Sequence, residues 1–376
     1  MKRNFINNLI ILLIAIMLSL LLKMLHVILP FMFGPILAAL LCVKVLKLKI
    51  RWPFWLSQIG LILLGVQIGS TFTQQVIKDI SKNWLTIVFV TILLILLALI
   101  IAFFFKKIAQ VNLETAILSV IPGALSQMLV MAEENKKANI LVVSLTQTSR
   151  VIFVVILVPL ISYFFQDNHH EMNHTTMEVP TLSQTLNIWQ IIILFSMVGI
   201  IYIGMSKINF PTKQLLAPII VLIIWNMTTH LTFSLDHWLL ATAQLIYMIR
   251  IGLQIANLMS DLKGRIAIAI AFQNIMLIVT TFIMIIGIHL ITNESINELF
   301  LGAAPGGMSQ IVLVAMATGA DVAMISSYHI FRIFFILFVI APLIGYFINV
   351  KLNYTFLNKT SKIFASNCNY LKVKSR

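Results

Sequence analysis

The sequence has few charged residues for its length. Asp, Glu, Lys and Arg make up only 10% of its 376 residues, whereas 60% are hydrophobic, and the mean hydropathy is +1.02. A soluble globular domain has about a quarter of its residues charged. This composition excludes a soluble domain and predicts an all-α polytopic membrane protein.

The residue patterns that mark enzymes are also lacking. Cys42, in an apolar stretch, and Cys368, near the end of the chain, offer neither a disulfide framework nor metal-ligand spacing. The sequence contains no phosphate-binding loop, dinucleotide fingerprint, nucleophile elbow or paired carboxylates. We therefore expect no enzyme, with no catalytic residues, no metal and no cofactor.

One polar stretch, DNHHEMNH, gathers three of the eight histidines. His169, His170 and His174 are residue types that bind soft or borderline metals. Their spacing matches no established site, so an ordinary polar loop is the alternative.

Acidic residues are scarcer than basic ones, 12 against 26, which gives a net charge of +14. A basic balance would suit nucleic acid, but most of the Lys and Arg lie in short stretches between apolar runs, where such residues set membrane topology. No soluble recognition element is present. We expect the lipid bilayer as a partner and no direct binding of nucleic acid, and self-association is left open.

The sequence contains one short motif that occurs twice, here called the repeated phrase. Residues 121–132 read IPGALSQMLVMA and residues 304–315 read APGGMSQIVLVA, 183 residues apart. A triplet of polar residues follows each copy at an offset of 182. The triplets are Ser144, Gln147, Arg150 and Ser326, His329, Arg332. Repeats of this length indicate that the two halves share one fold.

Ten apolar segments are long enough to cross a bilayer, which takes about 17–25 residues. They lie near 8–29, 31–48, 53–73, 84–105, 139–163, 188–206, 214–230, 237–259, 266–289 and 323–348. Two further segments, 114–133 and 297–317, carry the repeated phrase. If both re-enter on their own side, 20 Lys and Arg residues face inward and only Lys78 and Lys82 outward; if both cross, the counts are 14 and 8. The positive-inside bias favours re-entry.

Five crossings per half is an odd number, so the second half must enter from the opposite face and the halves form inverted-topology repeats. We expect a first membrane repeat over 1–165, an external polar loop over 166–187, a second repeat over 188–348 and a basic cytoplasmic tail over 349–376. Both termini are then cytoplasmic.

The repeated phrase is also the candidate site. Pro and Gly interrupt helical hydrogen bonding, and unpaired backbone survives at membrane depth only where protein or a water-filled cavity satisfies it. Helix ends exposed there can hold an ion; the alternative is close helix packing. The predicted substrate- or ion-binding residues are Pro122, Gly123, Ser126, Gln127, Gln147, Arg150, Arg250, Pro305, Gly306, Gly307, Ser309, Gln310, Asp321, His329 and Arg332.

Three arginines lie deep in apolar spans: Arg150, Arg250 and Arg332. Each costs about 2.5–3.5 kcal/mol on insertion scales, so each needs a partner. An anionic solute would supply one; the carbonyls of the loops, or the nearby carboxylates Glu133, Glu134 and Asp321, would make the arginines structural clamps instead.

Two titratable residues have two interpretations each. Asp321 is a proton or sodium site at the membrane edge, or a helix cap. His329 titrates near neutral pH, or only forms hydrogen bonds within the bundle.

The phrases PGALSQMLVMAEE and PGGMSQIVLVAMATGAD, with H-x-x-R following the second, resemble the AbrB family of bacterial membrane proteins. The resemblance implies a multi-pass inner-membrane protein with duplicated halves, grouped with transport proteins and labelled as an ammonia monooxygenase or as a transcriptional regulator. The first half departs from the pattern, with Ala124, Asn139 and Gln147 in place of Gly, Asp and His. The matching positions are Pro305, Gly306, Gly307, Ser309, Gly319, Ala320, Asp321, His329 and Arg332.

These observations favour a secondary transporter in the bacterial cytoplasmic membrane, which moves a small solute through a midplane site between the repeats. The buried positive charge favours an organic anion. The alternative is a membrane sensor that binds a ligand without moving it. A metal-dependent monooxygenase comes third, because the histidines outside one loop are scattered. Regulation of gene expression, which the resemblance implies, would then be indirect.

Labelling at residue 170 tests the predicted topology. We expect His170→Cys, in a chain lacking Cys42 and Cys368, to react with a membrane-impermeant maleimide in intact cells, because the re-entrant arrangement places this segment outside. Labelling only after permeabilisation would instead support twelve crossings.

Overall fold

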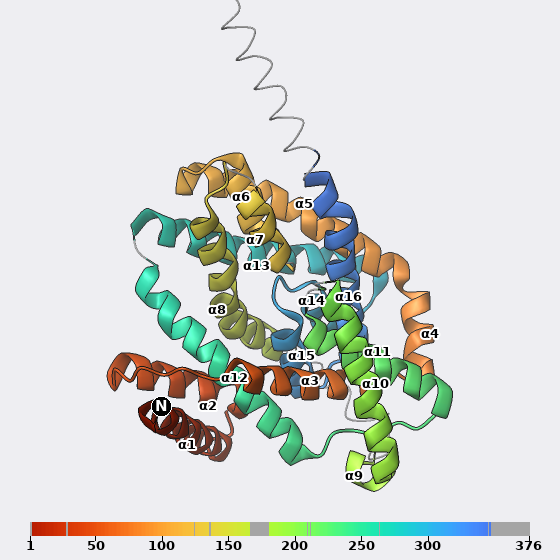
Figure 1. Cartoon of the computed structure of the whole chain (residues 1–376). Coiled ribbons are helices and arrows are strands. Elements are labelled where there is room, and N and C mark those ends of the chain that lie inside the picture. The colour runs from red at the N-terminus through yellow and green to blue at the C-terminus, as the bar shows by residue number, and fades with distance from the viewer. Residues whose placement is uncertain are drawn as a thin grey trace, which may run out of the picture.

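The computed structural model describes residues 2–27, 29–123, 125–134, 137–165, 180–208, 210, 212–262, 264–344 and 346. Within these ranges the elements are helices, joined by short connections and by one isolated bridge between Thr181 and Ser234 (Figure 1). The predicted basic tail and residues 166–179 of the predicted external loop, with its three histidines, lie outside the described residues.

The first half contains eight helices in the described ranges. They are α1 (Lys2–Met24), α2 (Pro30–Leu40, continued by a π-helical turn, Leu41–Val45), α3 (Phe54–Ser70), α4 (Gln74–Lys82), α5 (Trp84–Ala109), α6 (Leu113–Val120), α7 (Leu125–Glu134) and α8 (Ile140–Phe164).

The second half repeats most of this order. Its helices are α9 (Leu182–Thr185), α10 (Ile188–Lys207), α11 (Lys213–Thr229), α12 (His237–Asp261), α13 (Gly264–Thr292), α14 (Ile296–Ala303), α15 (Met308–Thr318) and α16 (Val322–Phe335, continued by a π-helical turn, Ile336–Ile340).

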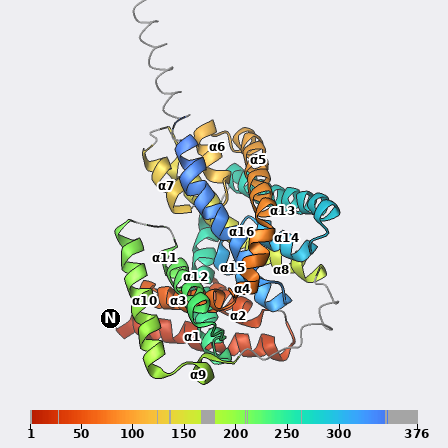
Figure 2. The same ribbon diagram turned by 90° about the vertical axis from the view of Figure 1, so that its right-hand side faces the viewer.

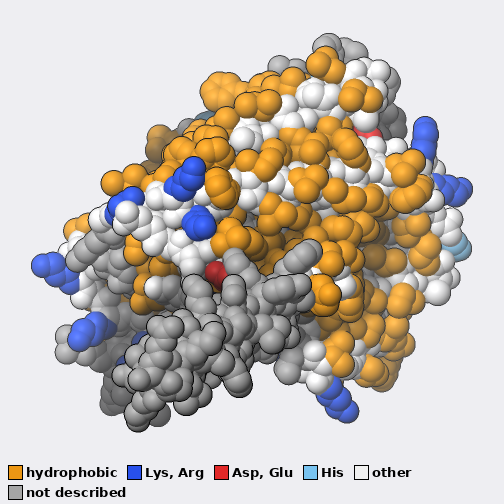
Figure 3. Space-filling model, turned by 90° about the horizontal axis from the view of Figure 1, so that it is seen from above, with side chains coloured by type: hydrophobic (Ala, Val, Ile, Leu, Met, Phe, Trp, Pro, Cys, Tyr) orange, Lys and Arg blue, Asp and Glu red, His pale blue; other side chains and the backbone are white. Residues whose placement is uncertain are grey.

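Seven helices of the described ranges are long and apolar enough to cross a membrane: α1, α5, α8, α10, α12, α13, and α16 with its continuation. An eighth candidate is the pair α3 and α4, which are bent by 81° relative to each other. Apolar side chains also cover the surface, as on α10, which lies at the edge of the molecule (Figure 2). Figure 3 shows a face on which hydrophobic side chains spread widely and Lys and Arg lie mostly toward the margins. For the described residues, the predicted helical fold is confirmed, and seven or eight helices could span a membrane where the sequence predicted ten.

The two halves share unusual backbone conformations. In the described ranges, seven non-glycine residues have positive φ, which is uncommon for residues with a Cβ. Six of them form pairs separated by 183 residues. The pairs are Leu29 and Thr212 (φ 59° and 53°), Lys47 and His230 (50° and 55°), and Gln110 and Asn293 (54° and 55°). The chain therefore turns in the same way at matched positions, as expected of a duplicated fold.

Each repeated Pro-Gly phrase lies at the tip of a helical hairpin. In the first half, the Asn112 amide donates to the Lys137 carbonyl, and the Asn139 N–H donates to the Thr115 hydroxyl at 2.9 Å. A straight helix over 113–134 would hold its ends about 30 Å apart. The contacts instead bring the start of α6 beside the residues that follow α7, so α6 and α7 run out and back.

The second hairpin closes in the same way. The Asn297 amide donates to the Thr318 hydroxyl at 3.4 Å, and the Asp321 N–H donates to the Glu298 carboxylate at 3.3 Å. Thr318 is the last residue of α15, and Asn297 and Glu298 begin α14. We name α6–α7 the first hairpin and α14–α15 the second hairpin.

The halves interlock through two reciprocal helix contacts, α3 with α11 and α12 with α2. A Cβ on Gly65 of α3 would lie 2.5 Å from Pro218 Cγ. A Cβ on Gly252 of α12 would lie 2.7 Å from Ala39 Cβ and 3.2 Å from the Pro35 carbonyl oxygen. Pro35 and Pro218 are themselves counterparts at the offset of 183. Glycine is required at both crossings because the helix backbones touch there.

Replacing these glycines tests the interlocking. We expect Gly65→Ala and Gly252→Ala each to lower the free energy of unfolding by about 1–3 kcal/mol, the usual cost of overpacking. Thermal unfolding of the purified protein in detergent measures this. Gly199→Ala and Gly287→Ala are matched controls, since a Cβ there meets nothing within 4 Å, and should be neutral or stabilising. Equal losses at all four positions would contradict the close contact.

Candidate functional site

Arg150 of α8 holds the tip of the first hairpin. Its Nη2 donates to the carbonyls of Ser119 at 3.0 Å and Val120 at 2.8 Å, and Nη1 donates to Ile121 at 3.3 Å. Gln147, one turn earlier, donates to Leu118 at 2.8 Å and accepts from Arg150 at 3.0 Å. Both side chains are buried. They satisfy the carbonyls that the Pro-Gly break leaves without helical partners.

Arg332 of α16 does the same for the second hairpin. Its Nη1 donates to Ala304 at 2.9 Å and its Nη2 to Gly306 at 3.1 Å. His329 contacts the Leu301 carbonyl at 2.9 Å, at the position matching Leu118. The two clusters therefore correspond at Leu118 and Leu301 and at Ile121 and Ala304, whereas the bonds to Ser119 and Gly306 have no counterpart in the described part of the other half. We call each one an arginine clamp.

The contacts of His329 fix its ring protonation. Its Nδ1 lies 2.6 Å from Arg332 Nη2. A guanidinium can only donate, so Nδ1 accepts and Nε2 carries the proton that reaches the Leu301 carbonyl. The ring is neutral and has no free nitrogen. Of the two interpretations of His329, the geometry favours hydrogen bonding within the bundle.

Each hairpin tip packs against the other half. A Cβ on Gly123 would lie 3.2 Å from Arg332 Nε and from Ile336 Cδ1. A Cβ on Gly306 would lie 2.6 Å from Val154 Cγ1. Val154 and Ile336 are counterparts at the offset of 182, so the exchange is reciprocal. Gly123 also has φ of +109°, a conformation that favours glycine.

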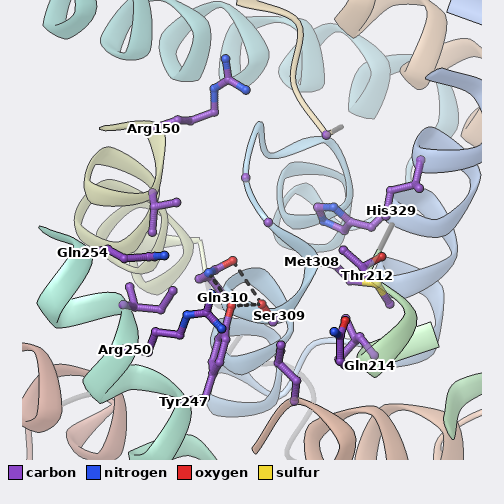
Figure 4. Close-up of a pocket in the computed structure, with 18 of the residues that line it drawn as sticks. Arg150, Thr212, Gln214, Tyr247, Arg250, Gln254, Met308, Ser309, Gln310 and His329 are labelled. Carbon is purple, nitrogen blue, oxygen red and sulfur yellow. Dashed lines mark hydrogen bonds between the residues drawn. The ribbon is translucent and has the colours of Figure 1, made fainter. Parts of the chain in front are cut away.

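Between the tips lies a cavity of about 370 Å3, large enough for a small molecule (Figure 4). Its described lining contains three arginines, one histidine and no Asp or Glu. Five glutamines also contribute to the lining: Gln58, Gln147, Gln214, Gln254 and Gln310. A polar solute would find amide donors and acceptors on several sides.

A hydrogen-bonded trio forms one wall of the cavity. The Tyr247 hydroxyl of α12 lies 2.8 Å from Ser309 Oγ and accepts from the Gln310 amide at 3.1 Å (Figure 4). Ser309 and Gln310 are the Ser-Gln pair of the second repeated phrase. They lie in the first turn of α15, whose N-cap is Gly307. The trio therefore fixes side chains at the positive end of a helix dipole.

Arg250 differs from the other two arginines. It lies one turn beyond Tyr247 on α12, and its guanidinium stacks 4.3 Å from the centre of the Phe54 ring. Within the described part of the chain it has no hydrogen bond or ion pair. Its side chain is half-buried and lines the cavity.

The structure separates the predicted site residues into two groups. Ten line the cavity: Gly123, Gln147, Arg150, Arg250, Gly306, Gly307, Ser309, Gln310, His329 and Arg332. Pro122, Gln127, Pro305 and Asp321 are not part of the lining, and the side chain of Ser126 lies outside what the structure describes. Asp321 accepts from the N–H groups of Ala323 and Met324, both at 2.9 Å, so it caps α16. Its counterpart Asn139 caps α8 likewise.

Several residues that line the cavity were not predicted from the sequence. Tyr247 and Gln254 lie three residues before and four residues after Arg250, so they share its side of α12. That spacing could have predicted both residues as part of the site. Four further residues line the cavity: Phe54, Gln58, Thr212 and Gln214. No sequence pattern predicts them as site residues, because each lies just before an apolar helix or near its start.

The clamp geometry predicts that glutamine can replace His329. We expect His329→Gln to change the free energy of unfolding by less than about 1 kcal/mol, because Gln147 makes the same two contacts in the first half. His329→Ala should cost about 1–3 kcal/mol, since it leaves the Leu301 carbonyl and an Arg332 donor unpaired. Thermal unfolding of the purified protein in detergent measures the stability of both variants. If glutamine were as damaging as alanine, the imidazole itself would be required.

Comparison with known proteins identifies the family of the chain. The family model described as "Transition state regulatory protein AbrB" matches residues 31–348. "Uncharacterized protein YhjN" of Bacillus subtilis (strain 168) is 24% identical over 302 residues, 77% of each chain. "Putative regulator AbrB" of Escherichia coli (strain K12) is 24% identical over 290 residues, 76% of this chain and 81% of its own. Because the family model spans both hairpins and both arginine clamps, the protein belongs to the AbrB family.

Proposed function

We propose that the protein is a secondary transporter, which moves a small solute through the cavity between its two halves. The observation that carries this proposal is the meeting of the two hairpin tips at one polar cavity. Broken helices that meet near the midplane at the interface of two repeats are the usual site of substrate binding in such transporters.

The proposed architecture has ten crossings. The seven long apolar helices and α3 supply eight, and α2 with its continuation (Pro30–Val45) and α11 supply the other two, although these are shorter. α4 then turns away at 81° to lie along the membrane surface. Five crossings and one hairpin fall in each half. The hairpins would be the re-entrant elements.

Inverted topology of the halves is supported by the course of α8. This helix begins at Asn139, beside the base of the first hairpin. Near its other end, Ser162 donates to the side chain of Asn297, at the base of the second hairpin. The 23 residues between Asn139 and Ser162 span about 35 Å at 1.5 Å per residue. Two hairpin bases at opposite ends of a spanning helix would enter the membrane from opposite faces.

The cavity is proposed to open toward the cytoplasm. Three of its lining residues, Phe54, Thr212 and Gln254, are exposed. Phe54 follows the basic stretch KVLKLKIR, and Thr212 lies between Lys207 and Lys213. The positive-inside bias places such stretches on the cytoplasmic side. This orientation also puts the termini inside, in the cytoplasmic membrane of a bacterium.

A sensor or regulator that binds the same solute without moving it is the second candidate. The observation that favours it is the name of the Escherichia coli relative, "Putative regulator AbrB". Any effect on gene expression would be indirect, through the bound or transported solute. A monooxygenase stays the third candidate; in the described part of the chain no three His, Cys, Asp or Glu residues gather as metal ligands.

Flux through reconstituted protein tests the proposal. We expect proteoliposomes to take up at least one member of a panel of small labelled organic solutes, and Tyr247→Phe to lower that flux about tenfold, because it leaves the Gln310 amide without its acceptor. Tyr163→Phe is the matched control, since Tyr163 is exposed and outside the cavity. Saturable binding with no flux across the panel would replace the transporter by the sensor.

A further inference from the structure

We propose that the solute is a small organic acid with one carboxylate group, and that Arg250 binds that carboxylate. The inference deepens the proposed function, because it rests on the same cavity. It assigns the three arginines unequal roles: two hold the protein together and one holds the ligand.

The guanidinium of Arg250 has N–H donors that are not used within the described part of the protein. Its guanidinium rests on the Phe54 ring at 4.3 Å, and in the described residues nothing accepts a hydrogen bond from it. Stacking on an aromatic ring orients a guanidinium while leaving its N–H edge available. A fork of this kind matches a carboxylate through two parallel hydrogen bonds.

The Nη donors of the other two arginines are already bound to backbone carbonyls. Both Nη atoms of Arg150 donate to the first hairpin and both Nη atoms of Arg332 to the second. Only their Nε groups lack partners, and these are buried. A solute bound by either fork would have to displace the carbonyls of a hairpin tip. Arg250 alone can bind an anion without that cost.

Neutral hydrogen-bonding groups lie beside Arg250. Figure 4 shows its side chain reaching toward the trio of Tyr247, Ser309 and Gln310. The N-terminus of α15 lies at this trio, and the first N–H groups of a helix attract negative charge. The cavity therefore offers a cation, hydroxyls and a helix N-terminus on one side.

The single uncommitted guanidinium limits the charge of the solute. With one uncommitted guanidinium, the site satisfies one carboxylate in full. A second carboxylate would meet glutamine amides, apolar side chains such as Leu61 and Val151, and the guanidiniums of Arg150 and Arg332. The Nη donors of these two arginines are already bound to the hairpin carbonyls, so the second charge would be left poorly matched. The remainder of the solute is therefore small, uncharged and partly apolar.

The experiment uses a thiol reporter in the cavity, so the solute itself does not have to be identified first. Gln254→Cys, in a chain lacking Cys42 and Cys368, places a thiol one turn from Arg250. Its modification rate is measured with an anionic and a cationic methanethiosulfonate of similar size, each relative to a free thiol in solution. We expect the anionic reagent to be favoured about tenfold, since the uncommitted guanidinium one turn from the thiol attracts anions, whereas Arg150 and Arg332 are bound to the hairpin carbonyls. Arg250→Gln should remove most of that preference, and Arg250→Lys should keep it.

Arg265→Gln is the matched control. It removes an arginine that is exposed and outside the cavity, and should leave the preference unchanged. If Arg250→Gln and Arg265→Gln gave the same preference, the assignment of Arg250 would be overturned.

Protection by simple acids tests the ligand class. Sodium propionate should slow modification of the reporter in the protein with Arg250 and not in the Arg250→Gln protein, whereas propionamide should protect neither. Absence of protection by propionate, or stronger protection by the dicarboxylate succinate, would overturn the single-carboxylate assignment.

These outcomes are separable from those of the flux experiment. Charge preference and protection without flux would keep the role of Arg250 and replace the transporter by a sensor. Flux that persists in Arg250→Gln would keep the transporter and overturn the role of Arg250.

Discussion

The structure depends on the pairing of buried arginines with the carbonyls of broken helices. A guanidinium in an apolar span and a carbonyl at a Pro-Gly break are each costly alone, because neither finds water there. The two arginine clamps satisfy both at once: Arg150 and Arg332 each hold the end of a short helix in their own half. This pairing allows irregular backbone at the centre of the molecule, and a cavity lined by it.

Duplication gives the two halves a common backbone, and a few substitutions give them different roles. Gln147 and His329 make the same contacts with different chemistry. At the offset of 183, Tyr247 and Arg250 correspond to Leu64 and Gln67. A Cβ on Gly60 would lie 3.3 Å from Tyr247 Cβ, so the small residue of one half makes room for the large residue of the other. The polar trio and the uncommitted guanidinium thus come from the second half alone.

Much of this could be predicted from the sequence. Apolar runs gave the helical membrane class, and the repeated phrase with its matched polar triplets pointed to the lining residues. The sequence could not decide between clamp and ligand contact for the arginines, since the decision depends on which carbonyls lie within reach of each side chain. In the sequence, Arg250 and Arg332 both lie deep in apolar spans and cannot be distinguished. In the structure, Arg332 donates to hairpin carbonyls, whereas Arg250 has no hydrogen bond within the described residues. Asp321 had two interpretations for a similar reason, and only the geometry of α16 shows the cap.

The claim on which the functional account most depends is that the two hairpins enter the membrane from opposite faces. Gln110 and Asn293 are counterparts at the two hairpin bases, and both are exposed. Single cysteines at these positions, in a chain lacking Cys42 and Cys368, can be labelled with an impermeant maleimide in intact cells and in inside-out vesicles. The account predicts that residue 293 is labelled in intact cells and residue 110 only in inside-out vesicles. Labelling of both positions from the same side would contradict it.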